Sequence, residues 1–268
     1  MWRKNYLRVL NTITVFCIIA GCIINGLRFF GGLAFNFIRS SSNAEVIGES
    51  GDLNSFSEID ADLSFGSLTI EYGDGYSYNY SGFTTETQPE FNVKGNKLEI
   101  RQKKNIDFNF FRDKAVDGKI TLTVPESSEI DMDINLSMGS FNLNDINMGD
   151  LTLDADMGAI TVKNCDMKDL NIQADMGGMT FKDCSFKDGD FNANMGGITL
   201  KDCSFDTANC DADMGSIEVS GAFDTLTGDC DMGSIKAENS NENAKYDLDC
   251  DMGSIKINGQ NKGDKYKN

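Results

Sequence analysis

The sequence predicts an all-β fold, a parallel β-solenoid of the β-helix or β-roll kind with coils of about 19 residues, preceded by one N-terminal transmembrane helix. Three observations predict this fold. A Met-Gly motif recurs at a nearly fixed period, apolar and polar residues alternate on both sides of each copy, and the N-terminal segment carries a long apolar run.

Residues 1–39 are expected to form a membrane anchor with a basic cytoplasmic flank. Residues 9–27 provide the roughly 20 apolar positions that span a bilayer. Positive charge precedes this run, which predicts a single-pass protein of a bacterial cell membrane with its C-terminal domain outside the cytoplasm. Two alternatives stay open. Residues 19–22 fit a lipoprotein cleavage box that would leave a lipid on Cys22, or the run is a buried helix of a soluble protein.

Residues 40–54 are expected to form a linker, and residues 55–130 a degenerate first repeat with an irregular β insertion. Residues 59–70 match the later coils, with Phe65 in the place of Met. Alternation predicts strands at 76–80 and 119–124. Residues 94–97 are expected to be the turn of a hairpin between two further strands.

Residues 101–114 differ from the rest of the extramembrane sequence because they hold five basic residues and three phenylalanines. Phe108, Phe110, Phe111 and Arg112 are the candidate contact residues. Either this segment packs its aromatic side chains on the end of the solenoid, or it is a contact loop for a membrane surface or a ligand.

The regular repeats are expected over residues 131–258, followed by a polar tail at residues 259–268. The first five methionines of the motif are 19 residues apart, and the last two steps are 18 and 20 residues: Met138, Met157, Met176, Met195, Met214, Met232 and Met252. Prolines are absent from these repeats, which suits a ladder in which every strand N–H donates.

The Met-Gly motif is expected to be a corner of the coil. The inside–outside alternation changes phase at each copy, and a phase change between two strands indicates a bend. We expect the Met to face the core and the Gly to permit positive φ or close backbone approach. The predicted corner glycines are Gly139, Gly158, Gly177, Gly196, Gly215, Gly233 and Gly253. A second bend is expected at Asn164, Asp183 and Asp202.

An outward-facing acidic column stands directly before the methionines. Its members would lie roughly 4.8 Å apart on neighbouring coils, so their like charges repel unless they are screened. This column is a candidate cation ladder, with calcium the natural ion for carboxylate oxygens. Hydration and salt are the alternative source of screening. The ladder comprises Asp156, Asp175, Asp213, Asp231 and Asp251.

Six of the eight cysteines lie in the repeats, and Cys165, Cys184 and Cys203 follow the 19-residue period. We expect reduced thiols stacked in the core as small apolar residues. Disulfides between neighbouring coils and a metal site are the alternatives. No cofactor is expected.

Charge and composition restrict the function. The net charge is −18, and the five basic residues of segment 1–39 leave 24 − 5 = 19 basic against 42 acidic residues, or −23, for residues 40–268. Such a domain repels nucleic acids and anionic lipids, and attracts cations, basic proteins and cationic peptides. Histidine, the commonest general base and zinc ligand, is absent from the sequence.

Several segments together carry a family resemblance: the apolar anchor, "IDADLSFGSLTIEYGDGYS", "KITLTVPESSEI" and coils of the type "DADMGAITV". Over about residues 55–258 the chain resembles the putative adhesin family of bacterial β-strand-repeat proteins. The resemblance implies a β-strand-repeat fold and a place in the cell envelope of Gram-positive bacteria. It implies no binding residues.

We therefore expect a non-catalytic interaction, adhesion-like or envelope scaffold module, attached to the membrane by its N-terminal helix. Its partner would be an envelope protein, a cationic peptide or a glycan, with self-association through the solenoid ends as a variant. A calcium-binding solenoid is the first alternative. A polysaccharide-active enzyme is the second and less favoured one, because the acidic residues recur in nearly every coil instead of marking one local site.

Overall fold

The computed structural model describes residues 46–102, 117–126 and 129–268. The predicted anchor with Cys22, and the candidate contact residues Phe108, Phe110, Phe111 and Arg112, lie outside these ranges. All regular secondary structure in the described ranges is β. Among the same residues there is no helix with the length and apolarity needed to cross a membrane.

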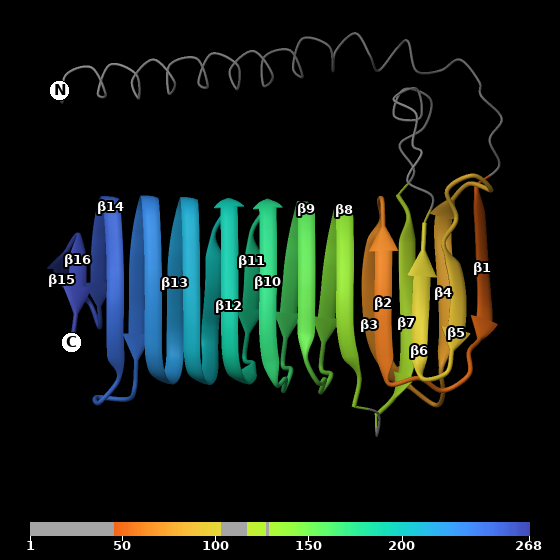
Figure 1. Ribbon diagram of the computed structural model, residues 1–268, viewed down its shortest axis with the longest axis horizontal. Helices are drawn as coiled ribbons and strands as arrows, with labels where there is room; N and C mark the ends of the chain where they lie inside the picture. The colour runs from red at the N-terminus through yellow and green to blue at the C-terminus, as the bar shows by residue number, and fades with distance from the viewer. Residues whose placement is uncertain (1–45, 103–116, 127–128) are drawn as a thin grey trace, which may run out of the picture. The chain divides into compact units, whose positions relative to one another are not determined.

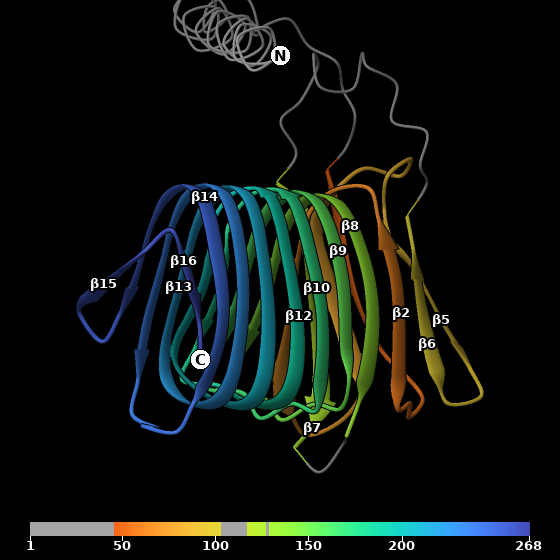
Figure 2. The same ribbon diagram turned by 60° about the vertical axis from the view of Figure 1, so that its left-hand side comes forward.

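The predicted parallel β-solenoid is confirmed for this part of the chain. Successive coils stack in register through parallel strands, as Figures 1 and 2 show for the green-to-blue part of the ribbon. Pairs such as Ile134 with Leu153 and Ala155 with Ala174 keep equivalent residues adjacent. The strands of the regular coils are β8 (Asp131–Asn144), β9 (Leu151–Lys163), β10 (Asp169–Met176), β11 (Met179–Lys182), β12 (Ser185–Met195), β13 (Ile198–Asn239) and β14 (Lys245–Ile257).

Each regular coil follows the alternation that the sequence predicts. In β9, Leu151, Leu153 and Ala155 are buried, whereas the residues between them are exposed. The next buried residue is Ile160, five positions after Ala155, so the inside–outside phase changes across Met-Gly. A step of five positions is odd, whereas inward residues of one strand are an even number of positions apart. The chain therefore turns there from one face of the solenoid to the next.

The degenerate first repeat forms a full coil. It consists of β2 (Glu58–Leu63) and β3 (Ser67–Gly73), which pair in parallel with the two halves of β8. The expected hairpin is also present as β5 (Glu90–Lys94) and β6 (Lys97–Arg101).

The sequence pattern did not reveal that a further coil lies between residues 97 and 125. The strands β6 and β7 (Lys119–Pro125) pair in parallel with β2 and β3, on the side away from β8. This coil therefore follows β2 and β3 in sequence but lies outside them in the stack. In the sequence, residues 103–116 separate the two strands of this coil where a regular coil has Met-Gly, which interrupts the period and hides the coil from a repeat search.

A buried glutamine completes the corner beside this insertion. The Gln102 side-chain oxygen accepts hydrogen bonds from the backbone N–H groups of Ser64 (2.8 Å) and Phe65 (3.0 Å). Its amide donates to the Thr87 carbonyl at 2.6 Å. Gln102 thus supplies an acceptor at a position where a regular coil uses the carbonyl of its neighbour.

Antiparallel strands cover both ends of the described stack, a departure from the all-parallel expectation. At one end, β1 (Ile47–Asp52) pairs with β4 (Ser77–Phe83), and β4 pairs with β7. At the other, β15 (Gln260–Gly263) and β16 (Lys265–Lys267) pair with β14. These strands satisfy the ladder hydrogen bonds of the terminal coils, whose edges would otherwise invite further pairing.

The core is a narrow apolar interior filled by columns of equivalent side chains. Phe186, Phe205 and Phe223 form one such column, with parallel rings whose centroids are 4.9 and 4.8 Å apart. Tyr246 extends the column with an edge-on contact at 6.0 Å. This spacing matches the distance between paired strands, so the stacking follows directly from the in-register ladder.

Candidate binding surface

The seven predicted corner glycines form one continuous column along the solenoid. A Cβ atom on Gly158 would lie 1.5 Å from the Gly139 carbonyl oxygen, and the corresponding distance is 1.6–1.9 Å for Gly139, Gly177, Gly196, Gly215, Gly233 and Gly253. Five of these glycines also have φ between 145° and 159°. The close approach of one coil to the next therefore excludes every side chain at this column.

The methionines of the motif lie at the surface, so the expectation that they face the core is wrong. The exposed fraction of the whole residue is 39% for Met157, 42% for Met176 and 55% for Met252. The other motif methionines, Met138, Met195, Met214 and Met232, are half-buried. Because the phase changes between Met and the next buried residue, the Met lies on the outside of the bend, and we call this row the methionine ridge.

The acidic residues before the ridge lie on its flank and point to solvent. Asp156, Asp213, Asp231 and Asp251 are exposed, and Asp175 is half-buried. Where an amide replaces an acid in this column, it bonds to its neighbour: Asn194 Nδ2 donates to Asp175 Oδ1 at 2.8 Å. This column and the one two residues earlier define what we call the acidic face.

The electrostatics of the acidic face reflect its like charges. Partial burial, followed by the neighbouring carboxylates, raises the pKa of Asp154, Asp211 and Asp229. Near the last coil, Lys265 pairs with Asp249 and Lys267 with Asp247. No group of three or more Cys, Asp or Glu in the described ranges is arranged to hold a metal ion. The acidic face therefore offers a diffuse negative field, and the calcium ladder stays a prediction.

The face on the other side of the ridge has mixed charge. A shallow pocket of about 320 Å³ lies on it where the coils of β13 meet. Lys201 and Lys236 line this pocket together with Asp202, Glu218 and Glu238. Since both signs of charge are present, the pocket has no strong preference for one ionic ligand.

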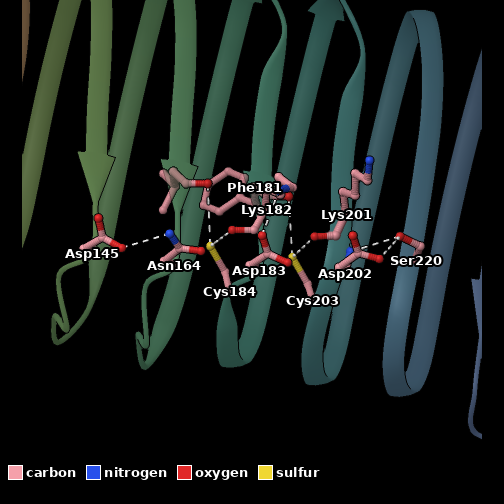
Figure 3. Close-up of polar contacts among 11 residues, drawn as sticks. Asp145, Asn164, Phe181, Lys182, Asp183, Cys184, Lys201, Asp202, Cys203 and Ser220 are labelled. Atoms are coloured by element: carbon pink, nitrogen blue, oxygen red, sulfur yellow. Dashed lines mark hydrogen bonds and ion pairs between the residues drawn. The ribbon is translucent and has the colours of Figure 1, made fainter.

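The second predicted bend is a column of left-handed residues, shown in Figure 3. Asn164, Asp183 and Asp202 have φ of 51°, 53° and 55°, and Asp145 and Asn258 extend the set. Asn and Asp tolerate this conformation better than other non-glycine residues. Side chains connect neighbouring members, as where Asn164 Nδ2 donates to Asp145 Oδ1 at 2.9 Å.

The cysteines beside this bend are free and buried. Cys184 Sγ donates to the Lys182 carbonyl at 3.2 Å and Cys203 Sγ to the Lys201 carbonyl at 3.4 Å, as drawn in Figure 3. The contact with Cys184 and burial raise the pKa of the Cys165 and Cys203 thiols. The raised pKa values keep the Cys165 and Cys203 thiols protonated, and protonated thiols are poor nucleophiles.

Solved structures of similar fold give this architecture a context. A putative adhesin from Bacteroides fragilis is 18% identical, with a TM-score of 0.61, over 81% of this chain and 98% of that chain. A putative adhesin from Parabacteroides distasonis is 14% identical, with a TM-score of 0.50, over 80% of this chain and 97% of that chain. At these identities the likeness concerns the fold alone. No curated protein sequence matches the chain.

A family model agrees with this likeness and extends over most of the chain. The model described as Toastrack DUF4097 matches residues 56–268, which include every regular coil, the coil of β6 and β7, and the strands β15 and β16. The protein therefore belongs to the Toastrack DUF4097 family.

Proposed function

We propose that the protein is a membrane-anchored, extracytoplasmic and non-catalytic interaction module whose acidic face binds a cationic partner of the bacterial envelope, a basic protein or peptide. The observation that carries this proposal is the repetition of outward carboxylates in consecutive coils. A repeated negative surface suits an extended ligand that carries positive charge at intervals, because each coil adds a similar contact.

The charge distribution along the stack supports this choice of partner. Consecutive coils of β13 and β14 carry pairs of outward acids, at positions 211 and 213, 229 and 231, and 249 and 251. The names of the similar structures, putative adhesins, favour an interaction role over catalysis. The sequence adds that a histidine base is absent and that no coil carries a unique cluster of acids.

Binding of a defined cationic probe tests the proposed face. The full-length protein in detergent micelles is titrated into fluorescent oligolysine, and anisotropy gives the affinity. The variant Asp211→Asn/Asp213→Asn/Asp229→Asn/Asp231→Asn should bind about tenfold more weakly, because four exposed ion pairs contribute roughly 1–3 kcal/mol together. Added salt should weaken binding of the parent protein.

A matched control variant distinguishes binding at the acidic face from a general effect of net charge. Replacing Glu71, Asp74, Glu86 and Glu90 by the corresponding amides changes the net charge by the same amount at exposed positions of the N-terminal region. This control should keep the parent affinity. Equal losses in both variants would show that the acidic face has no special role, and the proposal would then fail.

The anchor and its orientation need a separate test. Alkaline phosphatase fused after Asn268 should be active in cells if the solenoid is extracytoplasmic, and a cytoplasmic reporter at the same position should be inactive. Substitution Cys22→Ala distinguishes the two kinds of anchor. Metabolic labelling with a radioactive fatty acid should label a lipoprotein and should fail in this variant, whereas a transmembrane helix should stay unlabelled in both proteins.

A further inference from the structure

The methionine ridge is not explained by packing. Inward columns of the same coils accept several apolar residue types, such as Leu153, Ile172, Phe191 and Cys210 in equivalent positions. The ridge position is Met in seven successive coils although its side chains are exposed or half-buried. Packing in the core does not explain why one residue type recurs at a surface position. The property that distinguishes Met from Leu or Ile there is its polarizable thioether.

The register of the strands brings these thioethers into a regular row. Met157 pairs with both Met138 and Met176, and Met195 pairs with both Met176 and Met214. Met232 pairs with Met252 in the same way. Equivalent side chains on neighbouring parallel strands lie about 4.8 Å apart. Twice a metal–sulfur bond of about 2.3 Å is nearly the same length, so an ion between two neighbours could contact both sulfurs in a linear arrangement.

We propose that the methionine ridge is a binding site for a soft monovalent ion, Cu(I) or its analogue Ag(I), held between the thioethers of neighbouring coils. Soft thioether ligands select Cu(I) over the hard divalent ions that prefer carboxylate oxygen. The chemistry is ligand exchange alone, and neither the ion nor the sulfur changes its oxidation state.

The surroundings of the ridge favour a cation at this place. The acidic column of Asp156, Asp175 and their equivalents lies one residue before five of the seven ridge methionines, so its negative field raises the local concentration of cations. Thioethers are uncharged and stay available at every pH. The six described cysteines are buried, and several of their thiols already donate to backbone carbonyls, which leaves the ridge as the accessible row of sulfur in the described ranges.

Methyl NMR with a diamagnetic ion tests the site directly. The full-length protein is labelled with ¹³C at the methionine ε-methyl groups, and silver nitrate is added. Chloride is omitted so that the ion stays soluble. We expect the signals of Met157, Met176 and Met195 to shift, whereas the buried Met132, Met148, Met167 and Met179 stay unchanged. Shifts confined to methionines outside the ridge, or none at millimolar silver, would overturn the proposal.

Paired variants give the corresponding affinity test. Met157→Leu/Met176→Leu/Met195→Leu removes three adjacent thioethers at nearly constant volume, and Met132→Leu/Met148→Leu/Met167→Leu removes three from the core. Competition for Cu(I) with a chromophoric chelator should show a loss of about tenfold or more for the ridge variant and none for the core variant. Because Met138, Met214, Met232 and Met252 remain in the ridge variant, the measurement is repeated with all seven ridge methionines replaced by Leu. An unchanged affinity there would assign the copper to the cysteines and disprove the site. Thermal melting of these variants reports that they fold.

Discussion

At the scale of single residues, the coil is determined by atoms that approach across the stack. The glycine column is required because the carbonyl oxygen of one corner occupies the space that the next Cβ would need. The Asn and Asp column is required for a different reason, since its backbone is left-handed and its side chains bond to neighbouring coils. Both columns repeat with the coil, so each is visible in the sequence.

The glycine column predicts a sharp contrast between two adjacent residues. In Gly177→Ala the new Cβ would lie 1.7 Å from the Gly158 carbonyl oxygen, whereas in Gly178→Ala the nearest atom is 3.6 Å away. We expect Gly177→Ala to destabilise the fold by about 3 kcal/mol or more and Gly178→Ala to have little effect, as measured by urea unfolding. Similar midpoints for the two variants would contradict the close approach of the coils.

The left-handed backbone of the Asn and Asp column predicts that replacement by glycine keeps the stability that replacement by alanine loses. Asp183 has a φ of 53°, so Asp183→Ala should cost about 1–2 kcal/mol of unfolding free energy. Asp183→Gly should be nearly neutral, because glycine adopts this conformation without a steric penalty. The same unfolding experiment checks both variants, and equal losses would indicate that the side-chain contacts of Asp183 matter more than its backbone.

The methionines show the limit of prediction at this scale. The alternation and the phase change are readable from residues such as Ala155 and Ile160, and the structure confirms both. The side of the bend that Met157 occupies cannot be predicted from the sequence. The step of five positions from Ala155 to Ile160 leaves one residue outside the alternation, and the apolar side chain of Met157 suggests the core. Its exposure follows from the path of the backbone through the corner, which the pattern does not contain.

At the scale of elements, the N-terminal coils are less regular than the repeats. The coil of β2 and β3 and the hairpin of β5 and β6 follow from local alternation and turn residues. The pairing of β6 and β7 with β2 and β3 does not, since residues 103–116 separate the two halves of that coil and no Met-Gly motif marks its corner. Long-range pairing of this kind depends on which edge is free, and a single sequence carries little information about that.

A substitution of Gln102 tests the contacts between the N-terminal elements. Its side chain bonds to the Ser64 and Phe65 amides and to the Thr87 carbonyl, in a buried position. We expect Gln102→Ala to destabilise the fold by about 2–3 kcal/mol, because the variant loses three hydrogen bonds of a buried side chain and leaves their backbone partners unsatisfied. Gln173→Ala, at an exposed position of a regular coil, is the control and should change the melting temperature little.

At the scale of the whole molecule, the parallel columns turn a modest local charge into a long acidic face. Five of the seven regular coils add acids at the same angular position, so the like charges accumulate along the stack instead of spreading around it. The net charge and the two outward columns are both readable from the sequence. The ligand of the acidic face cannot be predicted from the sequence, because charge and spacing alone do not identify the molecule that binds there.

The acidic face predicts the dependence of stability on pH. The pKa values of Asp154, Asp211 and Asp229 are raised, so the folded state takes up protons at higher pH than the unfolded state. Their contribution to stability therefore rises as the pH falls from 7 through these raised pKa values. Asp60 acts in the opposite sense, because the hydrogen bond from Arg101 lowers its pKa below 3.8, and its contribution is lost only at lower pH.

Thermal melting between about pH 7 and pH 4 measures this effect. We expect the melting temperature to rise on mild acidification, and to rise less in Asp211→Asn/Asp229→Asn. A melting temperature that falls steadily over the whole range would show that repulsion on the acidic face contributes little. Added salt at pH 7 should reproduce part of the stabilisation, since it screens the same repulsion.

The position of the β6–β7 coil also bears on how the chain assembles as it leaves the ribosome. Strands β1 to β7 are synthesised before the regular repeats, and together they close one end around the coil of β2 and β3. That coil then offers a single open edge, on which β8 and each later coil can be added in the order of translation. Nearly identical coils could otherwise pair one repeat out of place, and a template finished beforehand gives the growing stack a defined first position.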